Sequence, residues 1–348
     1  MSRPVLYIHA GSHKTGTTAI QQALLAATRE LRSQGVCWPV LRTNLAPTKA
    51  HSKLVRLVYA DDPLSRLRGR WLASSVRRQA RGMATTVLSS EKIYRIGYEF
   101  FENAEQDTPR KRERRIAFLR RLRGLFADHF DVRVLLYLRR VDDFAESMYK
   151  ELLFRKPYAG RFLFERFLVE QRALFDFGGQ IRELQANLGP VSVHSYHAAC
   201  AVGLVEHFCG LIGARLPAQP GHGARVRQSA SNTAALFLER LSADRALTHA
   251  DRLQVLEFSV SGRMPSTGNR SLWPTRESLE SFMRQNHSPE LDGLFPAIDW
   301  GALQFGPLDD REFQASLAAF EDWRRNAAPS GAGSAGETPP GTGTPPRA

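Results

Sequence analysis

The chain is 348 residues long, and its 43% hydrophobic and 24% charged residues are ordinary for a soluble globular protein with an ample core. Its formal net charge of +13 at pH 7 is unusual, and it favours an acidic partner such as a nucleotide, an anionic polysaccharide, nucleic acid or an anionic membrane. The three cysteines lack metal-ligand spacing, and no stretch approaches the roughly 18 apolar residues of a membrane span. These features argue against a zinc site, a disulfide framework and a transmembrane protein. The first apolar run stops by Ala10, so we expect no cleaved signal peptide and a cytoplasmic protein.

Short apolar runs alternate with helical patterns over the first 215 residues. We expect helices at residues 20–31, 51–59, 71–81, 109–130, 142–153, 161–172, 176–188 and between 197 and 212, an extended segment at 36–39 and a loop at 40–50. The apolar runs predict four buried strands, over Val5–Ile8, Thr85–Leu88, Val132–Leu138 and Val191–Tyr196. This order predicts an α/β fold with a P-loop-like parallel sheet flanked by helices. Ligands of such sheets bind beyond the carboxyl ends of the strands.

The second half of the chain has a different pattern. Residues 232–243, 250–261, 276–285 and 310–325 have helical spacing, so this half is predicted to be helical. From Asn326 the chain is almost entirely Ala, Pro, Ser, Gly and Thr, which cannot bury enough apolar surface to offset the entropy of ordering. We therefore expect one domain over residues 1–326 and a disordered tail over residues 327–348.

The predicted helix at 109–130 is crowded with basic residues, namely Arg110, Lys111, Arg112, Arg114, Arg115, Arg120, Arg121 and Arg123. A run of this kind can bind nucleic acid, but no recognised nucleic-acid module surrounds it. The pattern favours a solvated helix face, and no specific nucleic-acid partner is expected.

The most informative stretch is the loop that follows the first predicted strand. It contains Gly11, Ser12, His13, Lys14, Thr15, Gly16, Thr17 and Thr18. A strand, a basic loop bounded by glycines and a helix N-terminus together make an anion site, because backbone N–H groups and the helix dipole both favour negative charge there. The nucleotide-kinase form of this loop places Lys and then Ser/Thr directly after the second glycine. Here Thr17 and Thr18 follow Gly16, and Lys14 lies inside the loop.

The order of these loop residues resembles the 5′-phosphosulfate loop of the sulfotransferase superfamily, and in particular its bacterial members. The resemblance covers roughly residues 4–215 and implies that the donor is 3′-phosphoadenosine 5′-phosphosulfate (PAPS). Members of the family bind the donor's 3′-phosphate with an arginine at a strand end and a serine eight residues later. Arg139 and Ser147 have that spacing here, and Arg140 is the alternative arginine. Arginine suits this role because its guanidinium can hold a phosphate through two hydrogen bonds.

The resemblance also implies a mechanism without a metal, because a transferring sulfuryl group carries less charge than a phosphoryl group. Lys14 and the loop amides would stabilise the departing phosphate. Family members activate the acceptor hydroxyl with His or Glu. Two residues are candidates for this base: Glu91, which directly follows the second strand and is our first choice, and His51, which follows the first helix and a loop.

The sequence therefore predicts a PAPS-dependent sulfotransferase that acts on a hydroxyl, with a glycan or glycolipid as the expected acceptor. The segment from Arg225 to Ser231 departs from the asparagine-serine segment of bacterial members, which leaves donor contacts there open. Two alternatives stay open as well. A P-loop kinase or nucleotidase would need Mg²⁺ and a nucleoside triphosphate, and a polyanion- or nucleic-acid-binding protein would need neither nucleotide.

Overall fold

A five-stranded parallel sheet forms the centre of the protein. The structure, a computed structural model, describes residues 3–12, 14–43, 46–47, 51–60, 62–96, 109–155, 163–216, 230–244, 247–265 and 269–326. The strand order is β2-β5-β1-β6-β7, with every neighbouring pair parallel. The strands are β1 (Val5–His9), β2 (Val36–Cys37), β5 (Thr85–Ser89), β6 (Asp131–Leu138) and β7 (Val191–Ser195). The four predicted strands and the α/β fold class are thus confirmed, and the segment expected to be extended supplies the edge strand β2.

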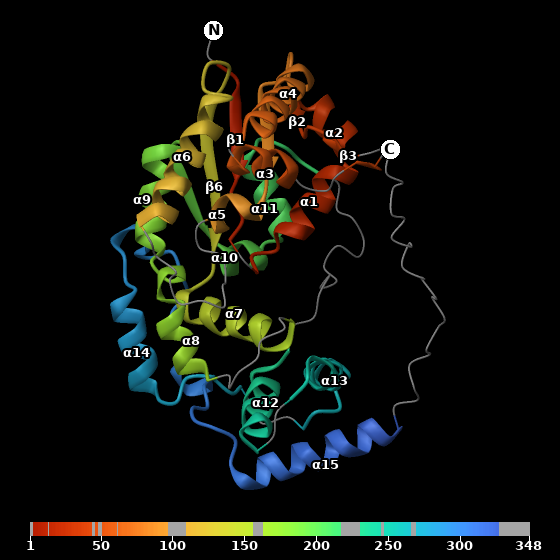
Figure 1. Ribbon diagram of the computed structural model, residues 1–348, viewed down its shortest axis with the longest axis vertical. Coiled ribbons are helices and arrows are strands. Elements are labelled where there is room, and N and C mark those ends of the chain that lie inside the picture. Colours follow the sequence, from red (N-terminus) through yellow and green to blue (C-terminus); the bar gives the residue numbers. More distant parts are fainter. Residues whose placement is uncertain are drawn as a thin grey trace, which may run out of the picture.

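Helices cover both faces of this sheet (Figure 1). On β1, Leu6 and Ile8 pack into the larger hydrophobic cluster, whereas Tyr7 packs against the smaller cluster on the other face. Because both faces are covered, the central strands β1 and β6 are apolar over most of their length. The smaller cluster includes residues of α1 (Thr17–Ala26), α2 (Thr28–Ser33), α10 (Tyr196–Ala201) and α11 (Leu204–Leu211). The larger one includes residues of α3 (Ser52–Ala60), α4 (Pro63–Gln79), α5 (Glu91–Arg95), α6 (Pro109–Gly124) and α9 (Phe177–Asn187).

A second group of helices extends from the carboxyl-end side of the sheet, at the bottom of Figure 1. Helix α7 (Val141–Arg155) follows β6 directly and packs against α8, α12, α13 and α14. The remaining elements are α8 (Phe164–Glu170), α12 (Asn232–Asp244), α13 (His249–Val260), α14 (Arg276–Gln285), α15 (Asp310–Asn326), three short 3₁₀ helices (Arg172–Leu174, Pro289–Leu291, Trp300–Ala302) and the strand pair β3 (Arg42–Thr43) and β4 (Ala46–Pro47). No helix in the described ranges is long and apolar enough to cross a membrane.

Several predicted boundaries are wrong in detail. The single helix expected at 20–31 is divided at Ala27 into α1 and α2, and residues 42–47 contain a strand pair instead of only loop. The helix expected after β7 is divided into α10 and α11 at Gly203, whose φ of 94° is a conformation that favours glycine. The long basic helix α6 ends at Gly124, not at residue 130. The predicted tail, residues 327–348, lies outside the described residues, so the domain boundary stays a prediction.

The expectation of a solvated basic face on α6 is wrong for Arg115. Its side chain is 1% exposed and forms an ion pair with Glu183 of α9. It also donates hydrogen bonds to the carbonyl oxygens of Ile93, Tyr94 and Ile96 at the end of α5. A buried guanidinium is tolerated here because a carboxylate pairs with its Nε and helix-end carbonyls accept from its Nη1. Arg115 therefore ties α5 to α6 and α9.

Candidate functional site

The loop after β1 has a constrained backbone. Lys14 has a φ of 62° and is the only non-glycine residue with positive φ in the described part of the chain. Gly16, with a φ of 68°, is the N-cap of α1. Within the loop, the Ser12 hydroxyl donates to the carbonyl of Tyr137 on β6 at 2.8 Å, and the Thr15 hydroxyl donates to the carbonyl of Ser12 at 2.8 Å. Backbone conformations of this kind cost free energy and persist where surrounding contacts hold them, often at functional sites.

The start of α1 is suited to an anion. Gly16 has no side chain to cap the first N–H groups of the helix. The Thr17 hydroxyl is buried and has no hydrogen-bond partner within the described ranges. A Cβ atom added to Gly11 would lie 2.2 Å from that hydroxyl oxygen, so glycine is required for the close approach. Thr18 is exposed, and His13 lies outside the described residues. Unsatisfied donors beside a helix N-terminus favour an oxyanion such as phosphate or sulfate.

Arg139, at the carboxyl end of the neighbouring strand β6, holds this loop. Its Nε donates to the carbonyl oxygen of Lys14 at 2.7 Å, and its Nη1 donates to Asp143 Oδ2 at 2.9 Å. Its guanidinium lies 4.4 Å from the centre of the Tyr196 ring, which gives a cation–π contact. The structure thus brings together two of the predicted donor-binding residues, Lys14 and Arg139.

Arg140 belongs to another part of the molecule. Its guanidinium pairs with Asp142 through two hydrogen bonds of 2.6 and 2.9 Å and reaches the carbonyl oxygen of Pro296 at 3.4 Å. It lines a pocket of about 440 Å³ together with residues such as Phe295 and Trp300. Arg139 is therefore the arginine that contacts the glycine loop, and Arg140 does not replace it.

Two carboxylates of α7 pair with the two cations. Lys14 Nζ lies 2.9 Å from Glu151 Oε2, and Asp143 contacts both Arg139 and His197, whose Nε2 is 3.2 Å from Asp143 Oδ2. Burial of the Asp143 carboxyl opposes its ionisation, but the close contact with His197 and the charge of Arg139 prevail and lower its pKa to about 2. Each cation of the candidate site is thus partly neutralised by an acid.

Sequence reasoning missed these acids, although a signal for them was present. Asp143, Ser147 and Glu151 follow Arg139 at intervals of four residues, so they lie along one side of α7. The Arg139–Ser147 spacing of eight residues is part of the same series. Ser147 is 7% exposed on this helix. Tyr196 and His197 were missed as well, although they directly follow strand β7, where side chains of a parallel sheet converge.

His51 has a structural setting. Its side chain is 2% exposed, its Nε2 is 2.8 Å from the carbonyl oxygen of Pro39, and its Nδ1 accepts a hydrogen bond from the backbone N–H of Ser89 at 3.0 Å. The Trp38 ring packs edge-on against it. Burial lowers the pKa of His51 to about 4. Both ring nitrogens are engaged by the backbone, so His51 joins β5 to the chain after β2.

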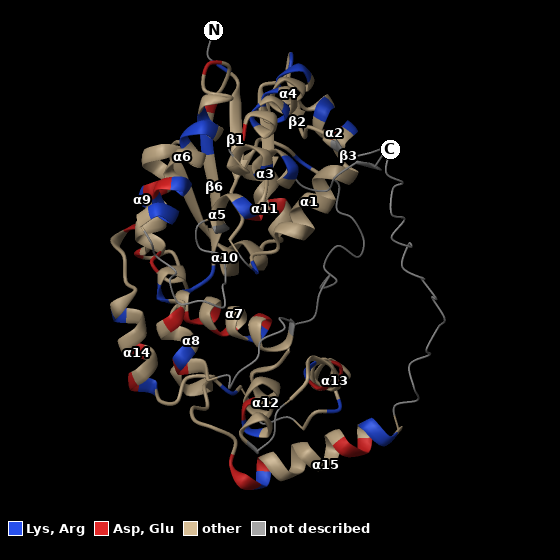
Figure 2. Ribbon diagram, in the orientation of Figure 1, with Lys and Arg blue, Asp and Glu red and all other residues tan. Residues whose placement is uncertain are grey.

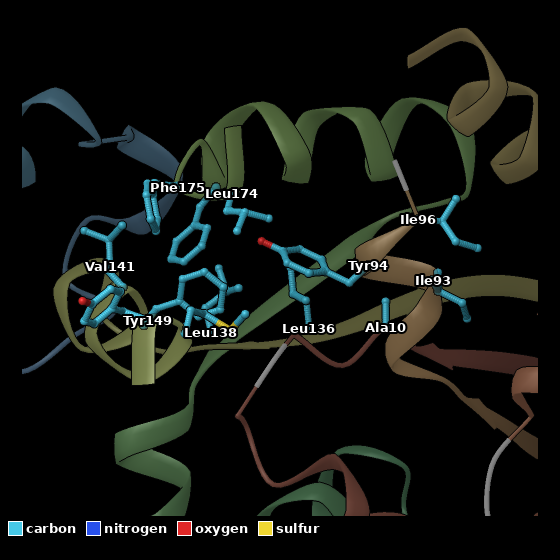
Figure 3. Close-up of a cluster of buried hydrophobic side chains, with 14 of the residues drawn as sticks. Ala10, Ile93, Tyr94, Ile96, Leu136, Leu138, Val141, Tyr149, Leu174 and Phe175 are labelled. Carbon is cyan, nitrogen blue, oxygen red and sulfur yellow. The ribbon is translucent and has the colours of Figure 1, made fainter. Parts of the chain in front are cut away.

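Glu91 is the first residue of α5 and is partly buried. Ser90 caps this helix by accepting a hydrogen bond from the N–H of Lys92 at 3.3 Å. Helix α5 shares one buried hydrophobic cluster with the ends of β1 and β6 and with α7 (Figure 3). The shared side chains include Ala10, Ile93, Tyr94, Leu136, Leu138, Val141 and Tyr149. The helix that carries Glu91 is therefore packed beside the two strand ends that carry Lys14 and Arg139.

Comparisons with known proteins add little to this description. No family model and no curated protein matches the chain. Two solved structures resemble it: a sulfotransferase domain from the Synechococcus PCC 7002 olefin synthase, with 11% sequence identity over 82% of this chain and 96% of that chain and a TM-score of 0.34, and a sulfotransferase domain from the curacin biosynthetic pathway, with 11% identity over 81% and 97% and a TM-score of 0.33. Similarities at this level carry no argument about the present protein, so its function has to be argued from its own residues.

Proposed function

We propose that this protein is a sulfotransferase that moves a sulfuryl group from PAPS to a hydroxyl group. The observation that carries the proposal is the contact between Arg139 and the backbone of Lys14, which joins the two predicted donor motifs across strands β1 and β6. The left-handed conformation of Lys14 and the uncapped start of α1 support it, because they give the loop several donors for an anion. PAPS is a substrate with two phosphate-bearing ends, and two cationic groups at adjacent strand ends suit such a molecule.

Lys14 and Arg139 have different roles in this proposal. Lys14 stabilises the negative charge that develops on the departing phosphate, which is an interaction made mainly in the transition state. Arg139 binds the 3′-phosphate, and Ser147 adds a hydroxyl donor from the same face of α7. Because Arg139 also holds the carbonyl oxygen of Lys14, it positions the lysine backbone as well. Asp143 and Glu151 hold the two cations in the absence of the donor, whose negative groups compete with them.

Glu91 is the proposed base that takes the proton from the acceptor hydroxyl. It lies at the start of α5, and a partly buried carboxylate can act as a base near neutral pH. His51 is not part of the proposal, because its Nδ1 already accepts a hydrogen bond from the Ser89 N–H and its Nε2 faces the carbonyl of Pro39. The proposed acceptor remains a glycan or glycolipid hydroxyl.

The proposal is tested by ligand-induced thermal stabilisation followed by a transfer assay. Adenosine 3′,5′-bisphosphate should stabilise the protein without metal and more than 5′-AMP does, since a ligand at a hundred times its Kd adds about 2.7 kcal/mol. Equal shifts from the two nucleotides would contradict a 3′-phosphate site, and stabilisation only by ATP with Mg²⁺ would indicate a kinase. Mass spectrometry of a panel of neutral and acidic glycans and glycolipids incubated with PAPS then identifies the sulfated acceptor.

A further inference from the structure

The excess positive charge of the protein is confined to one part of the chain. Residues 1–140 contain 27 Lys and Arg against 11 Asp and Glu, whereas residues 141–348 contain 21 against 24. In Figure 2, red ribbon segments (Asp and Glu) are correspondingly present on α7, α14 and α15, while blue segments (Lys and Arg) predominate on α2 and α4. The donor site uses only a few of the basic residues in the first part. The others call for a separate explanation.

Helix α4 carries an apolar stripe that faces away from the protein. Leu64, Leu67 and Trp71 are 54%, 65% and 67% exposed, and their spacing of three and four residues places them along one side of the helix. The opposite side, with Gly69, Leu72, Ala73 and Val76, is buried, and α4 packs there against α3. Figure 1 places α4 at the end of the molecule opposite α15. Three large apolar side chains in a row on an outer helix mark an interaction surface.

Arginines flank this stripe on both sides. At 100° per residue, Arg68 lies on one side of the Leu64–Leu67–Trp71 line and Arg70 lies on the other. Both arginines are exposed, and neither forms an ion pair with a described residue. The one described acid at the start of the helix, Asp62, is its N-cap and accepts a hydrogen bond from the N–H of Ser65 at 2.9 Å. The surface therefore presents apolar side chains between positive charges that no described acid pairs with.

We infer that α4 docks the protein on an anionic lipid surface, with the helix lying in the interface. Leu64, Leu67 and Trp71 enter the boundary between headgroups and acyl chains, and Arg68 and Arg70 contact lipid phosphates. A second copy of the chain is a poorer partner, because pairing two such stripes brings arginines against arginines. This docking surface lies outside the donor site, and the inference does not depend on the proposed function.

The experiment measures partitioning of the full-length protein onto vesicles by co-sedimentation. The protein should bind vesicles of phosphatidylcholine mixed equally with phosphatidylglycerol, bind pure phosphatidylcholine weakly, and dissociate as salt is added. The double variant Arg68→Gln/Arg70→Gln should bind about 25-fold more weakly, at about five-fold for each arginine. Leu67→Ser/Trp71→Ser should lose at least about ten-fold. All four side chains are exposed, so these variants should fold normally.

Matched controls come from the other part of the chain. Val169 on α8 is 69% exposed, and Arg324 on α15 is also exposed, so Val169→Ser and Arg324→Gln should bind vesicles as the unchanged protein does. Trp71 also reports its own position. Trp38 and Trp273 are buried, and Trp300 and Trp323 are partly buried. Trp71 should therefore account for the blue shift of tryptophan emission on vesicle binding. This shift should disappear in Trp71→Leu, which should still bind.

Three results would overturn the inference. One is no preference for anionic vesicles. Another is an equal loss of binding per arginine in Arg68→Gln/Arg70→Gln and in Arg324→Gln, which would assign the effect to net charge alone. The third is absence of vesicle binding together with a dimer in analytical ultracentrifugation, where the Leu67→Ser/Trp71→Ser variant is a monomer. The partner of α4 would then be a second copy of the chain.

Discussion

The two sides of the candidate site are built in different ways. On the β1–β6 side, Lys14 and Arg139 are charged, partly exposed, joined to one another through a hydrogen bond and paired with acids of α7. On the β5 side, the ring nitrogens of His51 bond to the backbone, and the hydroxyls of Ser89 and Ser90 bond to neighbouring side chains, so these polar groups serve packing. Under the proposed function, the groups that bind the donor are therefore already joined in the free protein, whereas the acceptor side contributes one carboxylate, Glu91, on a short helix.

The largest effect is expected at Glu91. If Glu91 is the base, Glu91→Gln should lower turnover by about 10²–10⁴, because a positioned base contributes that much, while the affinity for adenosine 3′,5′-bisphosphate hardly changes. Initial rates with PAPS and binding measurements would check this. Glu113→Gln on the exposed face of α6 is the matched control. Full activity in Glu91→Gln would assign the base to another residue.

The second-largest effect is expected for Lys14→Ala, on the β1–β6 side of the candidate site. Turnover should fall by about 10²–10³ with a smaller change in donor affinity, because the ammonium group meets charge that develops in the transition state. Lys53→Ala on α3 serves as the control. A variant that loses affinity but keeps its turnover number would show that Lys14 only binds the donor.

Arg139→Ala should weaken binding of adenosine 3′,5′-bisphosphate by about 30-fold, which corresponds to about 2 kcal/mol for a lost charged hydrogen-bond partner. The adjacent Arg140→Ala is a demanding control, since Arg140 pairs with Asp142 and faces the pocket beside Pro296. The double variant Lys14→Ala/Arg139→Ala should lose less than the sum of the single effects, because Arg139 positions Lys14. A larger loss in Arg140→Ala than in Arg139→Ala would exchange the two assignments.

His51→Gln, on the β5 side of the candidate site, should change the stability of the protein and not its turnover. The native pKa of His51 is about 4 and that of the fully buried His9 is about 3, both below the ordinary value of 6.5. The unfolded chain therefore takes up protons below pH 6.5 while the native state does not, and stability falls as the pH drops toward 4. Each histidine contributes a slope of about 1.4 kcal/mol per pH unit between those values.

Urea unfolding of His51→Gln at several pH values should show that the slope of stability against pH is lower by about 1.4 kcal/mol per pH unit, which is the contribution of one proton. Turnover should be nearly unchanged. Glutamine can still donate to the carbonyl of Pro39 and accept from Ser89, so the fold should persist. A collapse of turnover without any change in the pH slope would make His51 the base after all.

The smallest effect is expected at Glu151. Glu151→Gln removes the acid partner of Lys14, so adenosine 3′,5′-bisphosphate should bind a few-fold more tightly, because no ion pair has to open. The change is small because both side chains are about one quarter exposed, and water screens such pairs. Titration calorimetry of the variant and of Glu206→Gln, on α11, measures the difference. Weaker binding in Glu151→Gln would mean that the glutamate orders the loop.

The parts of this structure that the sequence predicts are those with local causes. The apolar runs predict β1, β5, β6 and β7, and the glycines with Lys14 predict an anion loop, because neighbouring residues decide both features. The acids that pair with this loop could not be assigned from local pattern, since Lys14 and Glu151 are 137 positions apart and meet only when α7 packs below the sheet. The same holds for Arg115, whose burial depends on uncapped carbonyls of another helix. The four-residue series from Arg139 to Glu151 is a local pattern that the sequence does show, but it does not reveal that Glu151 pairs with Lys14.

Arg115 has a consequence for the order in which the protein becomes active during synthesis. Helix α5 has five residues, too few to be stable alone, and the guanidinium that closes its last turn belongs to α6 while the paired carboxylate belongs to α9. A nascent chain that has emerged only as far as Arg139, the residue after β6, already contains both Lys14 and Arg139. Glu91 gains its support only after Glu183 has left the ribosome and α9 has docked. Under the proposed function, a partly synthesised chain would therefore bind an anion before it could activate a hydroxyl.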